Sequence, residues 1–436
     1  MPEPANSLNP PSAADGGAAL FTWLRRMRDE SPVVRGSNGS WYVFRYDDVQ
    51  RVLSEHADFS SDPTPVSPKA AEVAKGDLAQ IDPPVHHHLR RRISRVFTPR
   101  TVAELEPRIA EIGSRLLAGA GDADELDLVR HLTHPLPVIV IAELLGVPAE
   151  DRPVFRHWAD RIIAAKIAGI DDPETYERLR SAIEEMDYYL EGQLEERRAA
   201  PGDDLLGRMV AGEADGEPVS GAEAVNFARL LLIAGHITTT MMLSSSILCF
   251  DEHPEAAARL RADRSLIPAA IEEVMRYRPP FTITGRYTTR DVEISGVTIP
   301  ERSIVIPWLA SANRDERQFT DPDVFDIRRS PNAHVAFGKG IHFCIGAPLA
   351  RLEGKVALNL LFDRYADVRL DRDAALEFYE HNFFGVKSLP VSVKRSSTPE
   401  SGAAVDPPYN PYRSPRDRRS TSQVADPRAL PEDQYG

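Results

Sequence analysis

Residues 337–346 read FGKGIHFCIG, and residues 347–365 continue as APLARLEGKVALNLLFDRY. Glycines 338, 340 and 346 surround Cys344 in the first part, and the second part has the apolar spacing of a helix. Cys344 should therefore lie at a helix N-terminus, where free amide groups and the helix dipole favour a thiolate. The glycines allow the backbone to fold closely around the sulfur. The residues alone leave open a nucleophile, a metal ligand or a small buried apolar side chain.

The composition is that of a globular protein and argues against several classes of function. The chain has 436 residues, of which 42% are hydrophobic and 27% charged, so it can bury a large core. A formal net charge of −14 argues against nucleic-acid binding, which needs a basic face. Two cysteines are too few for a disulfide framework, a four-cysteine zinc site or an iron–sulfur cluster. Because neither a signal peptide nor an apolar run of about 18 residues is evident, we expect a soluble, cytoplasmic protein without a membrane span.

Helical patterns dominate the chain, which predicts a mainly α fold with a small β part. Helices are expected at 102–119, 152–168, 173–198, 226–250, 267–277 and 347–364. Strands are expected at 41–45, 292–300 (with a Ser-Gly turn) and 303–309. Residues 1–20 should be a flexible segment and residues 396–436, rich in Pro, Ser and charge, a disordered tail. The folded domain should then span residues 21–395.

The spacing FxxGxxxCxG at 337–346 resembles the haem-binding loop of the cytochrome P-450 family. Three more segments support the resemblance in chain order: DPPVHHHLR (82–90), EEVMR (272–276) and FTDPDVFDIRRSPNAHVAFGKG (319–340). The resemblance covers roughly residues 21–395 and is closest to soluble bacterial members that tailor polyketides and macrolides. It implies the cytochrome P-450 fold, with haem b between a long central helix and the loop of Cys344.

The resemblance also assigns roles to individual residues. Cys344 is implied as the axial ligand of the haem iron, and Glu273, Arg276 and Arg329 as a buried triad that braces its loop. The further haem contacts implied are His86, Arg90, Ala234, Arg286, Phe337, Gly338, His342 and Gly346. Neighbouring His87 and His88 are expected to be no more than a polar helix face.

One departure from the family pattern lies in the central helix, at AGHITTT (234–240). Most relatives carry an acid directly before the catalytic threonine, but this chain has Ile237 before Thr238. At about 100° per residue, Ala234 and Thr238 share a face, so Thr238 is implied as the catalytic residue. His236 lies about 200° round from Ala234, which favours packing or hydrogen bonding elsewhere over a role as the replacement acid.

The reaction implied is monooxygenation with O2, because a thiolate ligand favours O–O cleavage. The substrate is expected to be a polyketide or macrolide of antibiotic biosynthesis. Implied pocket residues are the loop at 62–81 together with Ala234, Ile237, Phe281, Thr282, Ile283, Thr284, Phe383 and Phe384. Three other readings stay open: a hydroxylase of a terpenoid, fatty acid or xenobiotic; a haem protein or isomerase that consumes no O2; and, more weakly, a thiolate hydrolase that uses Cys344.

Electrons are expected to come from NAD(P)H through a ferredoxin reductase and a small acidic ferredoxin, because the chain contains no flavin or iron–sulfur segment. The ferredoxin should dock on a basic patch on the cysteine side of the haem. The residues expected in this patch are Arg91, Arg92, Arg95, Lys339, Arg351 and Lys355. We expect the protein to act as a monomer.

Overall fold

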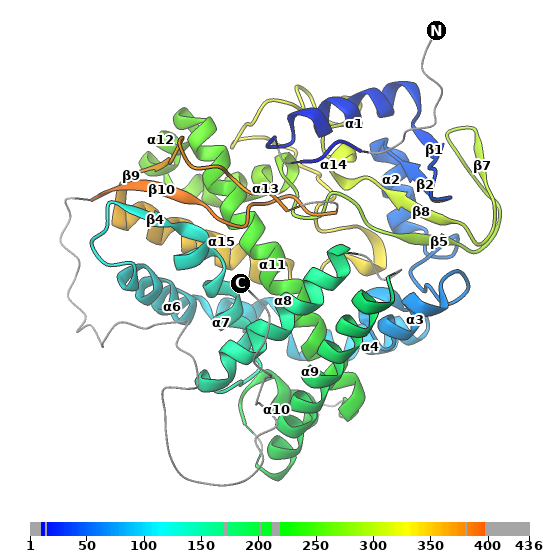
Figure 1. Cartoon of the computed structure of the whole chain (residues 1–436), viewed down its shortest axis with the longest axis horizontal. Coiled ribbons are helices and arrows are strands. Elements are labelled where there is room, and N and C mark those ends of the chain that lie inside the picture. Colours follow the sequence, from blue (N-terminus) through cyan, green and yellow to red (C-terminus); the bar gives the residue numbers. More distant parts are fainter. Residues whose placement is uncertain are drawn as a thin grey trace.

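A long central helix, α11 (Gly221–Glu252), organises the fold (Figure 1). It contacts α7, α8, α9, α10, α12, α13 and α15. The Ser220 hydroxyl accepts the amide of Glu223, whose carboxylate accepts the amide of Ser220, so the helix begins in a capping box. Most of its side chains are buried, which fits a helix that is apolar on nearly every face.

The same helix is long and apolar enough to span a membrane by length and composition alone, although no apolar run of that length was expected from the sequence. It is the single such helix among the described residues, and 72% of its most apolar 18-residue window is buried inside the protein. That burial is typical of the core helix of a globular domain.

This computed structural model describes residues 10–13, 15–168, 172–200, 202–211, 219–379 and 382–396. The helices before α11 are α1 (Ala18–Glu30), α2 (Tyr46–Ser54), α3 (Pro68–Ala74), α4 (Val85–Val96), α5 (Pro99–Ala103), α6 (Glu106–Gly119), α7 (Pro135–Leu144), α8 (Arg152–Ala168), α9 (Pro173–Ala199) and α10 (Leu205–Ala211). Those after it are α12 (Pro254–Ala262), α13 (Ile267–Tyr277), α14 (Leu309–Ala312) and α15 (Ala347–Arg364). Short turns are the π-helical η2 (Val129–Thr133) and the 3-10 turns η1 (Leu78–Gln80), η3 (Ala149–Asp151), η4 (Arg264–Leu266) and η5 (Gly340–His342).

Four expected helices, α8, α9, α13 and α15, agree with the sequence prediction to within one residue at each end. The single helix expected at 102–119 is wrong, because the chain breaks between α5 and α6. Pro107, in the first turn of α6, supplies no amide to a preceding helical turn. The prediction also missed α7, whose sequence PLPVIVIAEL is apolar almost throughout and so shows no helical periodicity.

The strands form three small sheets at the edges of the helical body (Figure 1). One has the order β1-β2-β8-β5-β3, with the parallel pair β2 and β8 in the register Trp41↔Val305 and the other neighbours antiparallel. The others are β4-β10-β9 and the hairpin β6-β7, which turns at Ser295 and Gly296, both with positive φ. The strands are β1 (Val33–Arg35), β2 (Trp41–Val43), β3 (Phe59–Ser60), β4 (Glu125–Asp127), β5 (Arg286–Thr288), β6 (Val292–Ile294), β7 (Val297–Ile299), β8 (Ile304–Pro307), β9 (Tyr365–Leu370) and β10 (Pro390–Arg395).

The folded part begins earlier than residue 21. Helix α1 starts at Ala18, Leu20 is buried, and the Asp15 carboxylate accepts the amides of Gly17 and Ala19. Ala13 is also buried. At the other end, the tail expected from residue 396 lies, from 397 onward, outside the described residues.

Candidate active site

The loop before α15 folds back on itself around Cys344. The Cys344 amide donates to the carbonyl of Phe337 across 2.9 Å. Gly338 and Gly340 have φ of 73° and 69°, a conformation that side chains rarely adopt. Gly340 also presses on the end of α2, where a Cβ would lie 2.9 Å from the carbonyl oxygen of Leu53. Two of the glycines that mark this stretch of sequence are therefore required by the shape of the loop.

The Cys344 thiol departs from the expected lowered pKa. Burial raises its pKa, although the amides of Gly346 and Ala347 and the guanidinium of Arg90 act in the opposite direction. The side chain is open to solvent on one side, but the protein around it excludes enough water to disfavour the charged form. Burial therefore opposes the effect of the helix terminus on the pKa of this thiol. Coordination of a metal ionises a cysteine, because the thiolate is the ligand.

A cluster of basic side chains lies next to the cysteine loop. The rings of His86 and His342 are 4.4 Å apart, and Arg90 donates to the carbonyl of Phe343 across 2.6 Å. Arg286 is buried, and burial lowers its pKa to about 10. Burial, followed by Arg90, lowers the pKa of His86 to about 4, and burial, followed by Arg286, lowers that of His342 to about 3. With pKa values this low both imidazoles are neutral at neutral pH, so Arg90 and Arg286 carry the positive charge of the cluster, and the Asp82 carboxylate offsets part of it.

This cluster fits the two carboxylates of a haem. His86 is 1% exposed, yet neither of its ring nitrogens hydrogen-bonds to any of the described residues, and the same is true of Nε2 of His342. Buried polar atoms of this kind are rare unless they serve a ligand. Carboxylates would accept from these imidazoles and from Arg90 and Arg286 as charge-assisted hydrogen bonds. The four residues that the sequence suggested are therefore close together and chemically suited to that partner.

The central helix presents Ala234 and Thr238 on one open face. Ala234 is exposed and Thr238 half-buried in a stretch where Ile237 and His236 are buried, as the helical spacing predicts. The Thr238 hydroxyl donates to the carbonyl of Ala234 across 2.7 Å, so its oxygen lone pairs are left to accept. His236 points away from this face, and its Nδ1 lies 3.1 Å from the carbonyl oxygen of Leu232.

The expected pocket residues separate into two groups. Phe281 and Phe383 form a β-bridge with their rings 5.0 Å apart, and Phe383 also packs against Ile237. Phe384 was expected beside them but is fully buried, against Phe21 and Phe378, so it belongs to the core.

The neighbouring segments complete the set of expected pocket positions. Thr282 is buried and its amide donates to Asn382, whereas Ile283 and Thr284 are half-buried. The loop at 62–81 carries α3 and η1, and its Gly76 lies against Asn226 of α11. This loop therefore reaches the central helix.

The buried carboxylate of Glu273 draws together helix α13 and residues 326–332. Arg276 donates to both of its oxygens across 2.8 Å, and Arg329 lies 3.2 Å away. The amide of Asp326 and the side chain of Asn332 also donate to it. Glu273 and Arg276 are completely buried. Helix α13 is thereby tied to the chain that leads into the cysteine loop.

The basic patch expected for a ferredoxin is partly neutralised. Three of its six cations form ion pairs: Arg92 with Glu223, Arg351 with Glu272 and Lys355 with Glu106. The guanidinium of Arg351 also lies 4.5 Å from the centre of the Phe337 ring. The remaining three, Arg91, Arg95 and Lys339, are exposed.

A family model described as Cytochrome P450 matches residues 31–395. The chain belongs to the cytochrome P450 family. This P450 is 44% identical over 384 residues to the erythromycin C-12 hydroxylase of Saccharopolyspora erythraea, covering 87% of this chain and 96% of that one. It is 42% identical over 390 residues to the cyclomarin C epoxidase CymV of Salinispora arenicola, covering 88% and 98%.

Among solved structures, the open cytochrome P450 EryK of S. erythraea is similar, with a TM-score of 0.84 and 43% identity over 90% of this chain and 100% of that one. The predicted family and the mainly helical fold are thus confirmed. The protein is a cytochrome P450 monooxygenase, and its family implies a bound haem.

We expect Cys344→Ala to abolish the red-shifted Soret band of the reduced carbon monoxide complex, because that band requires a thiolate ligand. Cys249→Ala is the matched control: Cys249 is buried in α11, 3.7 Å from a nitrogen of Arg278, and the variant should keep the band. The measurement is the reduced difference spectrum of each purified variant. Two variants with the same spectrum would show that Cys344 does not ligate the iron.

Proposed function

We propose that this P450 hydroxylates or epoxidises a macrolide or related polyketide in antibiotic biosynthesis. The similarity to the erythromycin C-12 hydroxylase carries the proposal, because it extends over 96% of that enzyme. Phe281, Ile237 and Phe383 offer an apolar surface, and the half-buried Thr284 follows Phe281 by three residues in the chain. Such a lining suits a large apolar ring with a few polar groups.

The residues of the site divide the work between them. When bound, a haem with a thiolate ligand activates O2 and splits the O–O bond. Cys344 would supply the thiolate, while His86, His342, Arg90 and Arg286 would hold the two carboxylates and fix the orientation of the ring. The Glu273 cluster holds the chain that leads into the cysteine loop, since two guanidinium groups converge on one carboxylate.

Proton supply is the unusual feature of this site. Ile237 occupies a position where most relatives carry an acid, and its side chain cannot pass protons from solvent. The lone pairs of the Thr238 oxygen can hold a water molecule, because the hydroxyl hydrogen is used by the Ala234 carbonyl. We propose that ordered water at Thr238 delivers the protons, with a hydroxyl group of the substrate as a second source.

The substrate class is tested by the haem itself. Added macrolides should displace water from the iron and shift the spectrum from low to high spin, whereas fatty acids, terpenoids and common xenobiotics should give weak shifts. Phe383→Ala should weaken macrolide binding, because it removes an aromatic wall shared with Phe281. If only a terpenoid or a fatty acid bound tightly, as judged by the spin shift, that substrate class would replace the macrolide in the proposal.

The threonine role is tested by coupling. Thr238→Ala should still bind substrate but divert electrons to hydrogen peroxide, so that product formed per NADPH consumed falls by about tenfold. Thr240→Ala is the matched control, because Thr240 makes the same bond to the carbonyl four residues back but is fully buried. Equal coupling in the two variants would remove Thr238 from the mechanism.

We propose that electrons come from an acidic ferredoxin that docks around Arg91, Arg95 and Lys339. These cations are exposed, and Arg90 ties the helix that carries Arg91 and Arg95 to the cysteine loop. The reduction rate should fall steeply as salt rises, and Lys339→Glu should lower it at low salt. Arg369→Glu, on β9, is the control for a general change in charge. A rate that ignores both salt and Lys339 would contradict this docking site.

A further inference from the structure

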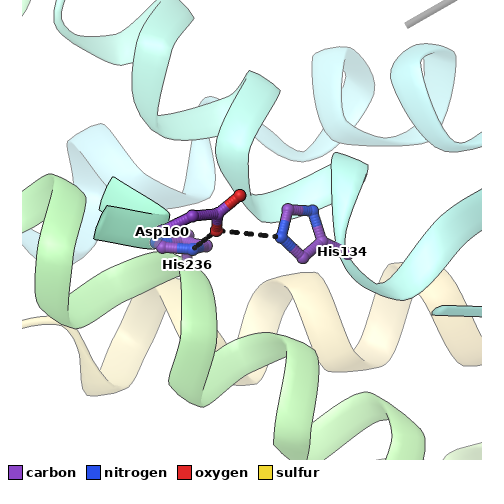
Figure 2. Close-up of side chains that lie close together, drawn as sticks. All are labelled: His134, Asp160 and His236. Carbon is purple, nitrogen blue, oxygen red and sulfur yellow. Dashed lines mark ion pairs between the residues drawn. The ribbon is translucent and has the colours of Figure 1, made fainter. Parts of the chain in front are cut away.

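Three helical segments bring His134, Asp160 and His236 together (Figure 2). His134 lies between the π-helical turn η2 and Pro135 at the start of α7, Asp160 lies on α8, and His236 lies on α11. Nε2 of His134 is 3.6 Å from Oδ1 of Asp160, and Nε2 of His236 is 3.7 Å from the same oxygen. The cluster does not lie on the open face of α11 that carries Ala234 and Thr238.

The hydrogen bond of His236 determines which of its ring nitrogens carries the hydrogen and which has a lone pair. Its Nδ1 lies 3.1 Å from the carbonyl oxygen of Leu232, and a carbonyl can only accept, so Nδ1 carries the hydrogen. In a neutral ring Nε2 then points a lone pair at the Asp160 carboxylate. Either a proton on Nε2 or a metal ion between these two atoms, 3.7 Å apart, would offset their repulsion.

The cluster has the dimensions of a small metal site. Its three candidate ligand atoms all lie within 4.8 Å of one another. Tetrahedral zinc, with bonds of about 2.0–2.1 Å, places its ligand atoms about 3.3–3.4 Å apart. The two distances to Asp160 are therefore close to those required. The third, between the histidines, would have to shorten by a movement of one ring.

The surroundings resemble those of known metal ligands. A ligating imidazole usually donates its other N–H to a carbonyl or carboxylate, as His236 does to Leu232. Both histidines are buried on packed segments, whereas the Asp160 side chain is 47% exposed. An ion could enter past Asp160, and water could fill the remaining coordination position.

We propose that His134, Asp160 and His236 bind one divalent transition-metal ion of the zinc class. Two imidazoles and one carboxylate suit zinc, cobalt or nickel, whereas magnesium and calcium prefer sites made of oxygen. The bound ion clamps α8 to α11 and to the start of α7. The site is separate from the haem and from Cys344, so it stands whether or not the macrolide proposal holds.

The test uses the untagged, haem-loaded full chain, freed of other metals with a chelator. Zinc titrated by calorimetry should bind at one equivalent per chain, in addition to the haem iron counted by elemental analysis. Zinc at about 100 times its Kd should raise Tm by about 3 °C, and magnesium should leave Tm unchanged. Absence of one-equivalent zinc binding would overturn the proposal and leave the cluster as an ion pair between protonated histidine and Asp160.

Variants locate the site. Asp160→Asn, His134→Ala and His236→Ala should each weaken zinc binding by about a hundredfold, because loss of an outer-shell partner alone costs about 10- to 100-fold. Asp160→Asn is the decisive variant, since its half-exposed side chain can change without disturbing the core, and an intact carbon monoxide spectrum verifies its fold.

The exposed histidines of α4 provide the control. His87 and His88 are a rival place for adventitious zinc, and the double variant His87→Ala/His88→Ala should bind zinc as the original chain does. Unchanged binding in Asp160→Asn, or lost binding in the double variant, would assign the zinc to another place and overturn the site.

Discussion

One buried carboxylate, that of Glu273, fixes the position of the cysteine loop. It accepts hydrogen bonds from Arg276, Arg329, Asn332 and the amide of Asp326, and is itself wholly buried. Removal of one partner from such a buried pair costs about 3–5 kcal/mol, because the remaining charge is left without compensation. The residues that follow Asn332 lead directly into the loop. The ionic cluster therefore restrains the position of the loop and of Cys344 within it.

The parts of the fold that sequence predicted well are those with local signals. Helices α13 and α15 show apolar periodicity and clear ends, and their bounds agree with the prediction. The predictions that failed concern features without a local signal in the sequence. The uniformly apolar α7 has no periodicity to read, and the burial of Phe384 depends on Phe21, which is distant in sequence.

The candidate site shows the same division. Short motifs identified Cys344 and the basic side chains around it, because each motif fixes its residues at constant spacing. Asp160 could not be predicted from sequence, because no motif in α8 includes it. Only folding brings it within 4 Å of histidines on two other segments. The pKa of Cys344 was also misjudged, since the local helix terminus favours the thiolate but the surrounding protein disfavours it.

The contact between Gly340 and the end of α2 links the cysteine loop to the β part of the molecule. A Cβ at residue 340 would collide with the Leu53 carbonyl and with Ser54, so the tip of the cysteine loop rests on a helix that packs against strand β8. The position of the cysteine loop thus depends on two contacts, that of the preceding residues 326–332 with Glu273 and that of Gly340 with the end of α2. An insertion near residue 54 would act on the sulfur as directly as one inside the loop, although 290 positions separate Ser54 from Cys344 in the chain.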